Sequence, residues 1–220
     1  MTKIFVATGF VLTLSLSAFA QTQSRDDILK TIEAKRAELA TLEKQFLSPS
    51  EEDQASHAEF LNQPDTGLIR LLPREKYDTA TTKDNKKSIT IRGGGAYYSF
   101  ARLTHEYGYG SDIELANGML STGFTGGHSG SLIDLGEIPL ETVSLETPAA
   151  RELANVATKK SSQSRVPLKL NSTYLLRSVD SAPSDVLVAF KVVRIDSDES
   201  AIILWKLLKK SPLTQGTRNN

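Results

Sequence analysis

A serine flanked by glycines, with a histidine beside it, is the first arrangement in this sequence whose residue types suggest catalysis. Ser129 lies in the stretch GFTGGHSGS, residues 123–131, next to His128 and Gly130. A serine hydroxyl becomes a nucleophile when an adjacent base, often histidine, removes its proton. The stretch therefore has two interpretations: a catalytic nucleophile, or a glycine-rich connection between strands.

The surrounding residues argue against the nucleophile. An elbow of the α/β-hydrolase type needs Gly-x-Ser-x-Gly between a buried strand and a helix. Here Ser131 replaces the last glycine and a strand-like run follows. A trypsin-like protease places histidine, acid and serine far apart along two barrels, whereas His105, Asp112 and Ser129 fall within 25 residues. We therefore predict that Ser129 is not catalytic and that Ser129→Ala leaves function intact.

Other common catalytic and ligand-binding motifs are incomplete. No two of the three histidines, His57, His105 and His128, are at metal-ligand spacing, and no zinc or EF-hand pattern occurs. The glycine run after Arg92 lacks the Gly-Lys-Ser/Thr of a phosphate-binding loop. Without any cysteine, the chain has no thiolate ligand, no cysteine nucleophile and no disulfide. We predict no catalytic residue, no metal site and no cofactor.

Carboxylate pairs keep one enzymatic alternative open. Glu106 with Asp112, or Glu114 with Asp134, could flank a glycosidic bond as the two acids of a glycosidase do. Nothing in the sequence distinguishes these side chains from surface acids. The alternative function is therefore a hydrolase that acts on a cell-wall or polysaccharide substrate through carboxylates of this region.

Glycine and tyrosine are concentrated in the same part of the chain. Eleven of the 14 glycines lie between Gly93 and Gly136, and four of the six tyrosines lie between Tyr97 and Tyr109. Tyrosine rings with glycine neighbours are little crowded and can stack on sugars or peptides. In the alternative interpretation, the tyrosines line the edge of a core and the glycines form turns. The candidate binding residues are Tyr97, Tyr98, Arg102, Tyr107 and Tyr109.

The N-terminus has the features of an export signal. Lys3 precedes the uncharged apolar run Ile4–Phe19, and Ala18-Phe19-Ala20 has the small-x-small form of a cleavage site. The alternative is an uncleaved membrane anchor, for which 16 residues diluted by Thr, Ser and Gly are short. We expect residues 1–20 to be a signal peptide, the mature protein to be secreted or periplasmic, and no integral membrane span to remain.

A helical arm is predicted over residues 21–62. Ser24 can cap a helix whose apolar stripe, interrupted by Lys35, recurs at steps of four and three: Ile28, Ile32, Leu39, Leu42 and Phe46. Such a stripe forms either a short coiled coil, giving a homo-oligomer through residues 24–46, or an amphipathic helix that lies on its own domain. Ser48-Pro49-Ser50-Glu51 predicts the start of a second helix, from Pro49 to near Leu61.

The rest of the chain predicts β-structure. Asn117-Gly118 predicts a hairpin within residues 113–120, and a short helix is expected near residues 148–157. The expected fold is mainly β, an antiparallel sandwich or barrel of about 8–10 strands over residues 63–211. A flexible tail is expected at residues 212–220. Other alternating or apolar runs favour strands near residues 68–72, 88–92, 96–104, 131–135, 173–179, 186–195 and 201–208.

The charge of the chain limits its partners. Lysine plus arginine and aspartate plus glutamate each number 26, so the formal net charge is zero and there is no basic stripe to hold a phosphate backbone. We expect no nucleic acid partner. The predicted function is an exported β-rich binding or structural protein of the cell envelope or extracellular space, with a protein or a glycan as its ligand. An oligomerising assembly protein is the second alternative.

Overall fold

The computed structural model describes residues 24–78, 92–105, 107–108, 110–124, 129–155, 164–180 and 184–211. The expected signal peptide, Tyr109, the expected tail and nearly all of the expected strand at 88–92 lie outside these residues. By its internal contacts the chain divides into two compact units, Met1–Thr41 and Leu42–Asn220, and each is described by itself.

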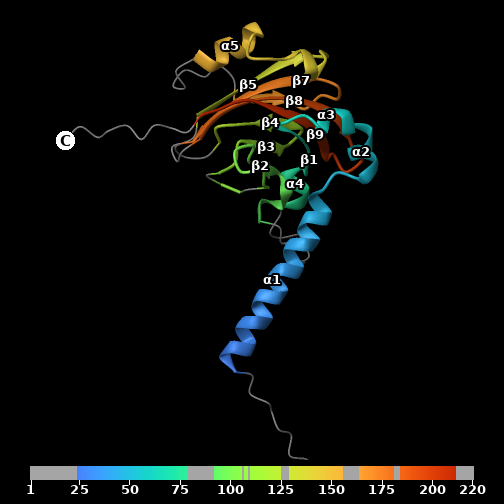
Figure 1. Ribbon diagram of the computed structural model, residues 1–220, viewed down its shortest axis with the longest axis vertical. Coiled ribbons are helices and arrows are strands. Elements are labelled where there is room, and N and C mark those ends of the chain that lie inside the picture. Colours follow the sequence, from blue (N-terminus) through green and yellow to red (C-terminus); the bar gives the residue numbers. More distant parts are fainter. Residues whose placement is uncertain are drawn as a thin grey trace, which may run out of the picture. The chain divides into compact units, whose positions relative to one another are not determined.

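The helix predicted over residues 24–46 is confirmed as α1, Arg25–Leu47, most of which belongs to the first unit (Figure 1). Ser24 caps it, because its Oγ accepts a hydrogen bond from the Asp27 N–H at 3.1 Å. Five large apolar side chains of this helix are exposed: Ile28, Leu29, Ile32, Leu39 and Leu42. At its C-terminal end Phe46 is half-buried and Leu47 is buried. None of the helices within the described ranges is both long enough and apolar enough to cross a membrane.

The second predicted helix is divided at His57 into α2, Glu51–Ser56, and α3, Ala58–Leu61. Its N-cap is Ser50 rather than Ser48. Ser50 Oγ accepts from the Asp53 N–H at 3.1 Å, and the Asp53 carboxylate accepts from the Ser50 N–H at 3.0 Å. This reciprocal capping box fixes the start of α2 two residues later than predicted.

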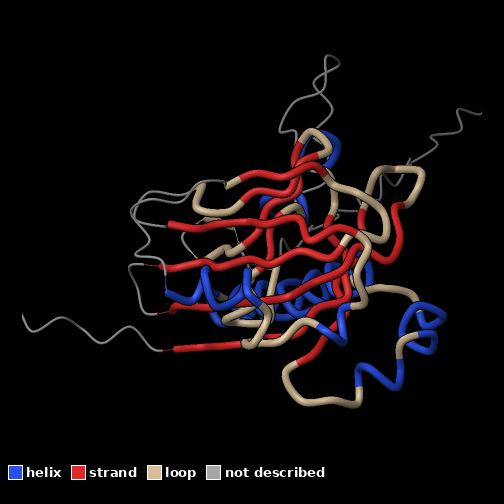
Figure 2. Tube along the Cα trace, turned by 90° about the horizontal axis from the view of Figure 1, so that it is seen from above, coloured by secondary structure: helices blue, strands red, loops and turns tan. Residues whose placement is uncertain are grey.

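Nine strands in the described residues form two antiparallel sheets, so the chain is sheet-rich with an N-terminal helix. Sheet A has the order β1-β9-β8-β7-β5, with strands Thr66–Leu71, Ala201–Ser211, Ser184–Ile195, Thr173–Asp180 and Ser129–Gly136. Its long strands run side by side in Figure 2. Sheet B has the order β2-β3-β4-β6, with strands Tyr97–Tyr98, Ile113–Ala116, Met119–Ser121 and Arg165–Pro167.

The hairpin predicted at Asn117-Gly118 is confirmed between β3 and β4. Asn117 has a φ of 51° and Gly118 a φ of 66°, the two positive values that a type I′ turn requires. The three consecutive strands predicted near the C-terminal end are also confirmed, as β7, β8 and β9. Local sequence signals were sufficient in these places.

The strand predicted over residues 96–104 is wrong beyond Tyr98, where β2 ends. Residues 99–104 form a tight turn, in which the Ser99 N–H donates to the Thr104 carbonyl at 2.8 Å. Leu103 has a φ of 58° in this turn, a value that an extended strand excludes. The short strand β6 was not predicted, because three residues are too few to show an alternating pattern.

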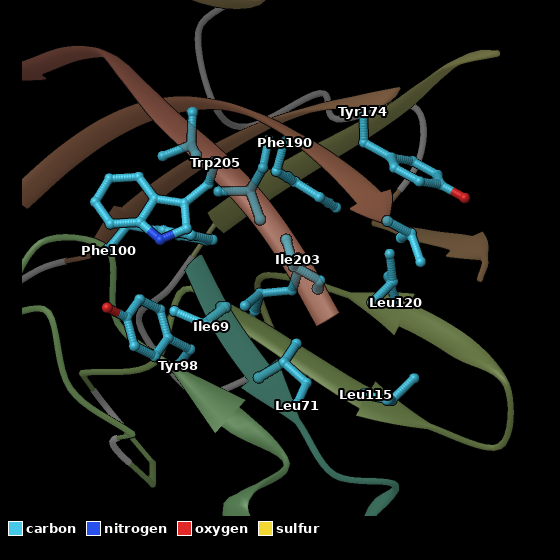
Figure 3. Close-up of a cluster of buried hydrophobic side chains, with 14 of the residues drawn as sticks. Ile69, Leu71, Tyr98, Phe100, Leu115, Leu120, Tyr174, Phe190, Ile203 and Trp205 are labelled. Carbon is cyan, nitrogen blue, oxygen red and sulfur yellow. The ribbon is translucent and has the colours of Figure 1, made fainter. Parts of the chain in front are cut away.

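Both sheets contribute to one hydrophobic cluster, shown in Figure 3. Phe190, Ile203 and Trp205 of sheet A meet Tyr98 and Leu120 of sheet B in this cluster. A second cluster lies on the other face of sheet A, where α3, η2 (Leu140–Thr142) and α5 (Pro148–Asn155) cover the strands. Strands β8 and β9 are therefore buried on both faces, which explains their continuous apolar sequences.

Charged and polar side chains tie β1, α2 and α4 (Arg74–Tyr77) to the turn between β8 and β9. Arg70 of β1 donates to Asp196 at 2.8 Å, and Tyr77 of α4 donates to Asp198 at 2.6 Å. Arg194, at the end of β8, donates to Asp196 at 2.7 Å and also pairs with Asp53 of α2. The turn is thus held from three elements that are distant in sequence.

Asp198 is expected to make this turn sensitive to acid. Burial alone would raise the pKa of Asp198, but hydrogen bonds from Ser200 and Tyr77 lower it to about 2. A lowered pKa stabilises the folded state above the ordinary aspartate pKa, and this stabilisation is lost as pH falls from about 4 towards 2. Because the side chain is partly exposed, we expect a contribution of only about 1 kcal/mol.

Urea unfolding of the wild type and of Asp198→Asn, measured from pH 6 to pH 2, checks this expectation. The difference in unfolding free energy between the two proteins should shrink as pH falls through that range. Tyr77→Phe should remove part of the same difference, because it deletes the phenol that donates to Asp198. Parallel stability curves for the wild type and Asp198→Asn would contradict the assignment.

Candidate functional site

A row of polar side chains crosses the outer face of sheet B. Tyr97 of β2 lies opposite Glu114 of β3, which lies opposite Ser121 of β4. Their neighbours Tyr98 and Ile113 belong to the hydrophobic core. Because successive side chains of a strand point to opposite faces, the row faces away from that core. Even so, Tyr97, Glu114 and Ser121 are buried.

Glu114 is the centre of this row, and hydrogen bonds reach both of its carboxylate oxygens. Arg74 donates to Oε1 at 2.5 Å and the Tyr97 phenol donates to the same oxygen at 2.9 Å. The Ser121 hydroxyl donates to Oε2 at 2.9 Å. The carboxylate is 8% exposed and the Arg74 side chain 44%, so a buried charge is paired with a cation that reaches the surface.

The Tyr97 phenol is held in its protonated form. Burial raises the pKa of Tyr97 to about 12; the Arg74 side chain opposes this rise and Glu114 adds to it. At neutral pH the phenol therefore donates its hydrogen to Glu114, which fixes the ring in one orientation. This ring is the base of an aromatic cluster.

Tyr107 and Phe124 complete the aromatic cluster around Tyr97. The Tyr107 ring meets Tyr97 edge-on, with centroids 5.2 Å apart, and the Phe124 ring is tilted at 5.5 Å. Tyr107 is 48% exposed. Gly93, in the short helix η1 (Arg92–Gly95), leaves room for this packing. A Cβ atom there would lie 2.8 Å from both tyrosine rings, and its φ of 76° also favours glycine.

Only some of the predicted binding residues meet in this cluster. Tyr97 lies at its base and Tyr107 at its surface. Tyr98 is 5% exposed and packs against Phe100 in the core between the sheets. Arg102 is exposed on the tight turn of residues 99–104, and Tyr109 lies outside the described residues.

The sequence analysis did not predict Arg74 or Phe124 as binding residues. It named Glu114 only as a possible catalytic carboxylate, not as part of a binding surface. One available signal was Glu114 itself, a single carboxylate within the apolar strand Ile113–Ala116. Arg74 has no such signal, because it reaches Glu114 from a helix 40 residues earlier. Phe124 lies in the glycine-rich stretch of residues 123–131, in which Ser129 is the more conspicuous residue.

Two of the other carboxylates that the sequence suggested for catalysis, Asp112 and Asp134, make structural contacts instead. Asp112 is 1% exposed, and its Oδ2 accepts from the backbone N–H of Phe100 at 2.7 Å, which stabilises the tight turn. Asp134 lies in sheet A and pairs with Lys169 at 2.9 Å, so Glu114 and Asp134 belong to different sheets. Glu106 lies outside the described residues.

The structure also shows where His105 and Ser129, the other two residues of the rejected catalytic triad, lie. His105 Nε2 lies 2.7 Å from the Arg70 carbonyl, to which it must donate because a carbonyl only accepts. Burial lowers the pKa of His105. Ser129 is the first residue of β5, opposite Val179, and not part of a loop as predicted. His128 lies outside the described residues.

No protein-family profile, curated protein or solved structure matches the chain. Within the described ranges, no group of three or more His, Cys, Asp or Glu side chains is arranged to hold a metal ion. The aromatic cluster of Tyr97, Tyr107 and Phe124, with the Arg74–Glu114 pair beneath it, is therefore the candidate binding surface on geometry alone.

Proposed function

We propose that the protein is an exported binding protein of the cell envelope or extracellular space and that it binds a glycan through the aromatic cluster. The observation that carries the proposal is a half-exposed Tyr107 ring oriented by a buried, fully hydrogen-bonded base. A rigid aromatic side chain offers contact area at little cost in conformational entropy. Export rests on the features of residues 1–20, and a two-sheet sandwich on the core shared by both sheets.

A glycan suits this surface better than a peptide. Sugar rings have apolar C–H faces that stack on aromatic rings and hydroxyl groups that need charged or polar partners. Tyr107 and Phe124 supply rings, and Arg74 supplies guanidinium donors that reach the surface. A peptide would bind by pairing with a strand edge, and the edge strand here, β2, is only two residues long and both of them are buried.

A glycan array and a peptide array, each probed with the wild type and with Tyr107→Ala, test the proposal. We expect binding to a set of glycans that Tyr107→Ala weakens about tenfold, because loss of an aromatic contact worth about 1.4 kcal/mol is a factor of ten in affinity. Leu170→Ala, at a side chain 49% exposed and outside the aromatic cluster, is the matched control and should bind as the wild type. Binding to peptides alone, or glycan binding unaffected by Tyr107→Ala, would refute the proposal.

We also propose self-association through residues 24–46 as a second role, because α1 exposes five large apolar side chains. In proteins, most of a helix's stability comes from packing of its apolar face against a partner rather than from helix propensity. Light scattering should show a larger species for the wild type than for Ile32→Glu/Leu39→Glu. The matched control is Glu33→Gln/Ala40→Gln, which changes neighbouring residues outside the stripe. An identical mass for wild type and double glutamate variant would refute self-association.

A further inference from the structure

A cleft on the helical side of sheet A is separate from the aromatic cluster. It has a volume of about 300 Å³ and lies where the α2–α3 break, the short helix η2 and strand β9 come together. Its lining includes His57, Glu59, Phe60, Gln63, Glu141 and Leu204. None of these residues contributes to the core shared by the two sheets or to the aromatic cluster.

The cleft has an apolar floor and a polar rim. Phe60 is 7% exposed and Leu204 4% exposed, and both belong to the second hydrophobic cluster. Glu59, Gln63 and Glu141 are exposed at its edge. A ligand in this cleft would therefore meet hydrocarbon below and two carboxylates at the opening.

We propose that the cleft binds a cationic group carried on a short aliphatic stem, as in a lysine side chain or a primary alkylamine. The methylene stem would cover Phe60 and Leu204, and the ammonium would remain near Glu59 and Glu141 at the wet rim. Long cationic side chains bind to apolar surfaces in this way, with the charge kept in water.

The size and charge of the cleft support this ligand class. A volume of about 300 Å³ is at the small end of ligand pockets, which suits one side chain better than an extended ligand. The lining contains two acidic side chains, Glu59 and Glu141. An anionic ligand would be repelled by these carboxylates, and a neutral one would lack the charge attraction that a cation gains.

One cation, Lys206, lies next to Glu141 and must be considered. Its Nζ donates to the backbone carbonyl of Glu141 at 3.0 Å. Lys206 is thus held to the main chain at the edge of the cleft that Glu59 and Glu141 line. The electrostatic attraction for a second cation is therefore moderate, and we expect it to weaken as salt is raised.

Titration of the full chain with three small probes, followed by NMR chemical shifts, tests the proposal. The probes are n-butylamine, Nα-acetyl-lysinamide and the neutral Nα-acetyl-norleucinamide. We expect saturable binding of both amines, with the neutral probe at least about tenfold weaker. Binding of the peptide-like amine tighter than butylamine would assign the site to basic side chains of polypeptides; equal binding would assign it to free amines as well.

Variants separate the cleft from unspecific attraction. Glu59→Gln/Glu141→Gln should weaken both amines at least about tenfold. Glu137→Gln/Glu152→Gln removes the same charge at exposed positions outside the cleft lining and should bind within about twofold of the wild type. The proposal would be overturned if neither amine binds saturably or if the neutral probe binds as tightly as the amines. It would also be overturned if Glu59→Gln/Glu141→Gln binds the amines as tightly as the wild type does. The same variants should leave glycan binding unchanged, so the two proposed sites fail or succeed independently.

Discussion

Trp205→Ala is expected to lower the free energy of unfolding by about 3–5 kcal/mol, because it removes the largest aromatic side chain from the core. Trp205 is 4% exposed, and its ring meets Phe100 edge-on at 5.4 Å (Figure 3). It lies in β9, directly opposite Gly67 of the edge strand β1. The indole therefore covers a strand position that has no side chain of its own.

The pairing of Gly67 with Trp205 gives this prediction an internal check. A Cβ atom on Gly67 would lie 2.5 Å from the Trp205 ring, so Gly67→Ala should cost about 1–3 kcal/mol through overpacking. In a Trp205→Leu background the same alanine should cost at least about 1 kcal/mol less. Urea denaturation of the four proteins in this cycle measures both effects, and Leu170→Ala serves as a surface control. A Gly67→Ala cost that is equal in both backgrounds would show that the ring does not occupy this space.

Glu114→Ala is expected to lower the unfolding free energy by about 2–3 kcal/mol, because three hydrogen-bond donors lose their acceptor at once. Loss of one partner from a fully buried ion pair costs more, about 3–5 kcal/mol. The Arg74 side chain, however, is 44% exposed and can regain water. Denaturant unfolding measures this loss.

The same substitution should also weaken glycan binding at least about tenfold, since the Tyr97 phenol would lose the contact that orients it beneath Tyr107. Ser121→Ala, which removes a single donor from Glu114, is the matched control and should cost about 1 kcal/mol with binding retained. A Glu114→Ala protein with wild-type stability would contradict the structural role of this carboxylate. A protein that is destabilised but binds glycans normally would show that the polar row does not orient the aromatic cluster for binding.

Sequence reasoning succeeded where a signal is local. The Asn117-Gly118 turn, the long helix α1 and the final three strands each have their pattern within a few consecutive residues. It failed at Leu103, whose positive φ turns the chain back after two residues of strand. The turn is held by Asp112, which lies just before β3 and accepts a hydrogen bond from the Phe100 N–H.

The candidate site shows the same division. The concentration of glycine and tyrosine pointed to Tyr97 and Tyr107, and the rings of these two residues contact each other. Nothing nearby in sequence links Arg74 to Glu114, because that pair exists only when α4 packs over sheet B. Whether the cluster binds a ligand stays a prediction.

The pairing of β1 with β9 has a consequence for how the protein folds. These are the first and the last strands along the described chain, yet they are neighbours in sheet A. Contacts between residues so distant in sequence form slowly, since the entropy of closing a long loop is lost before the contact is gained. Sheet A therefore cannot be completed until β9 has been synthesised. Until then β1 has no partner strand in the sheet and β8 presents an unpaired edge, on which chaperones or other chains could act.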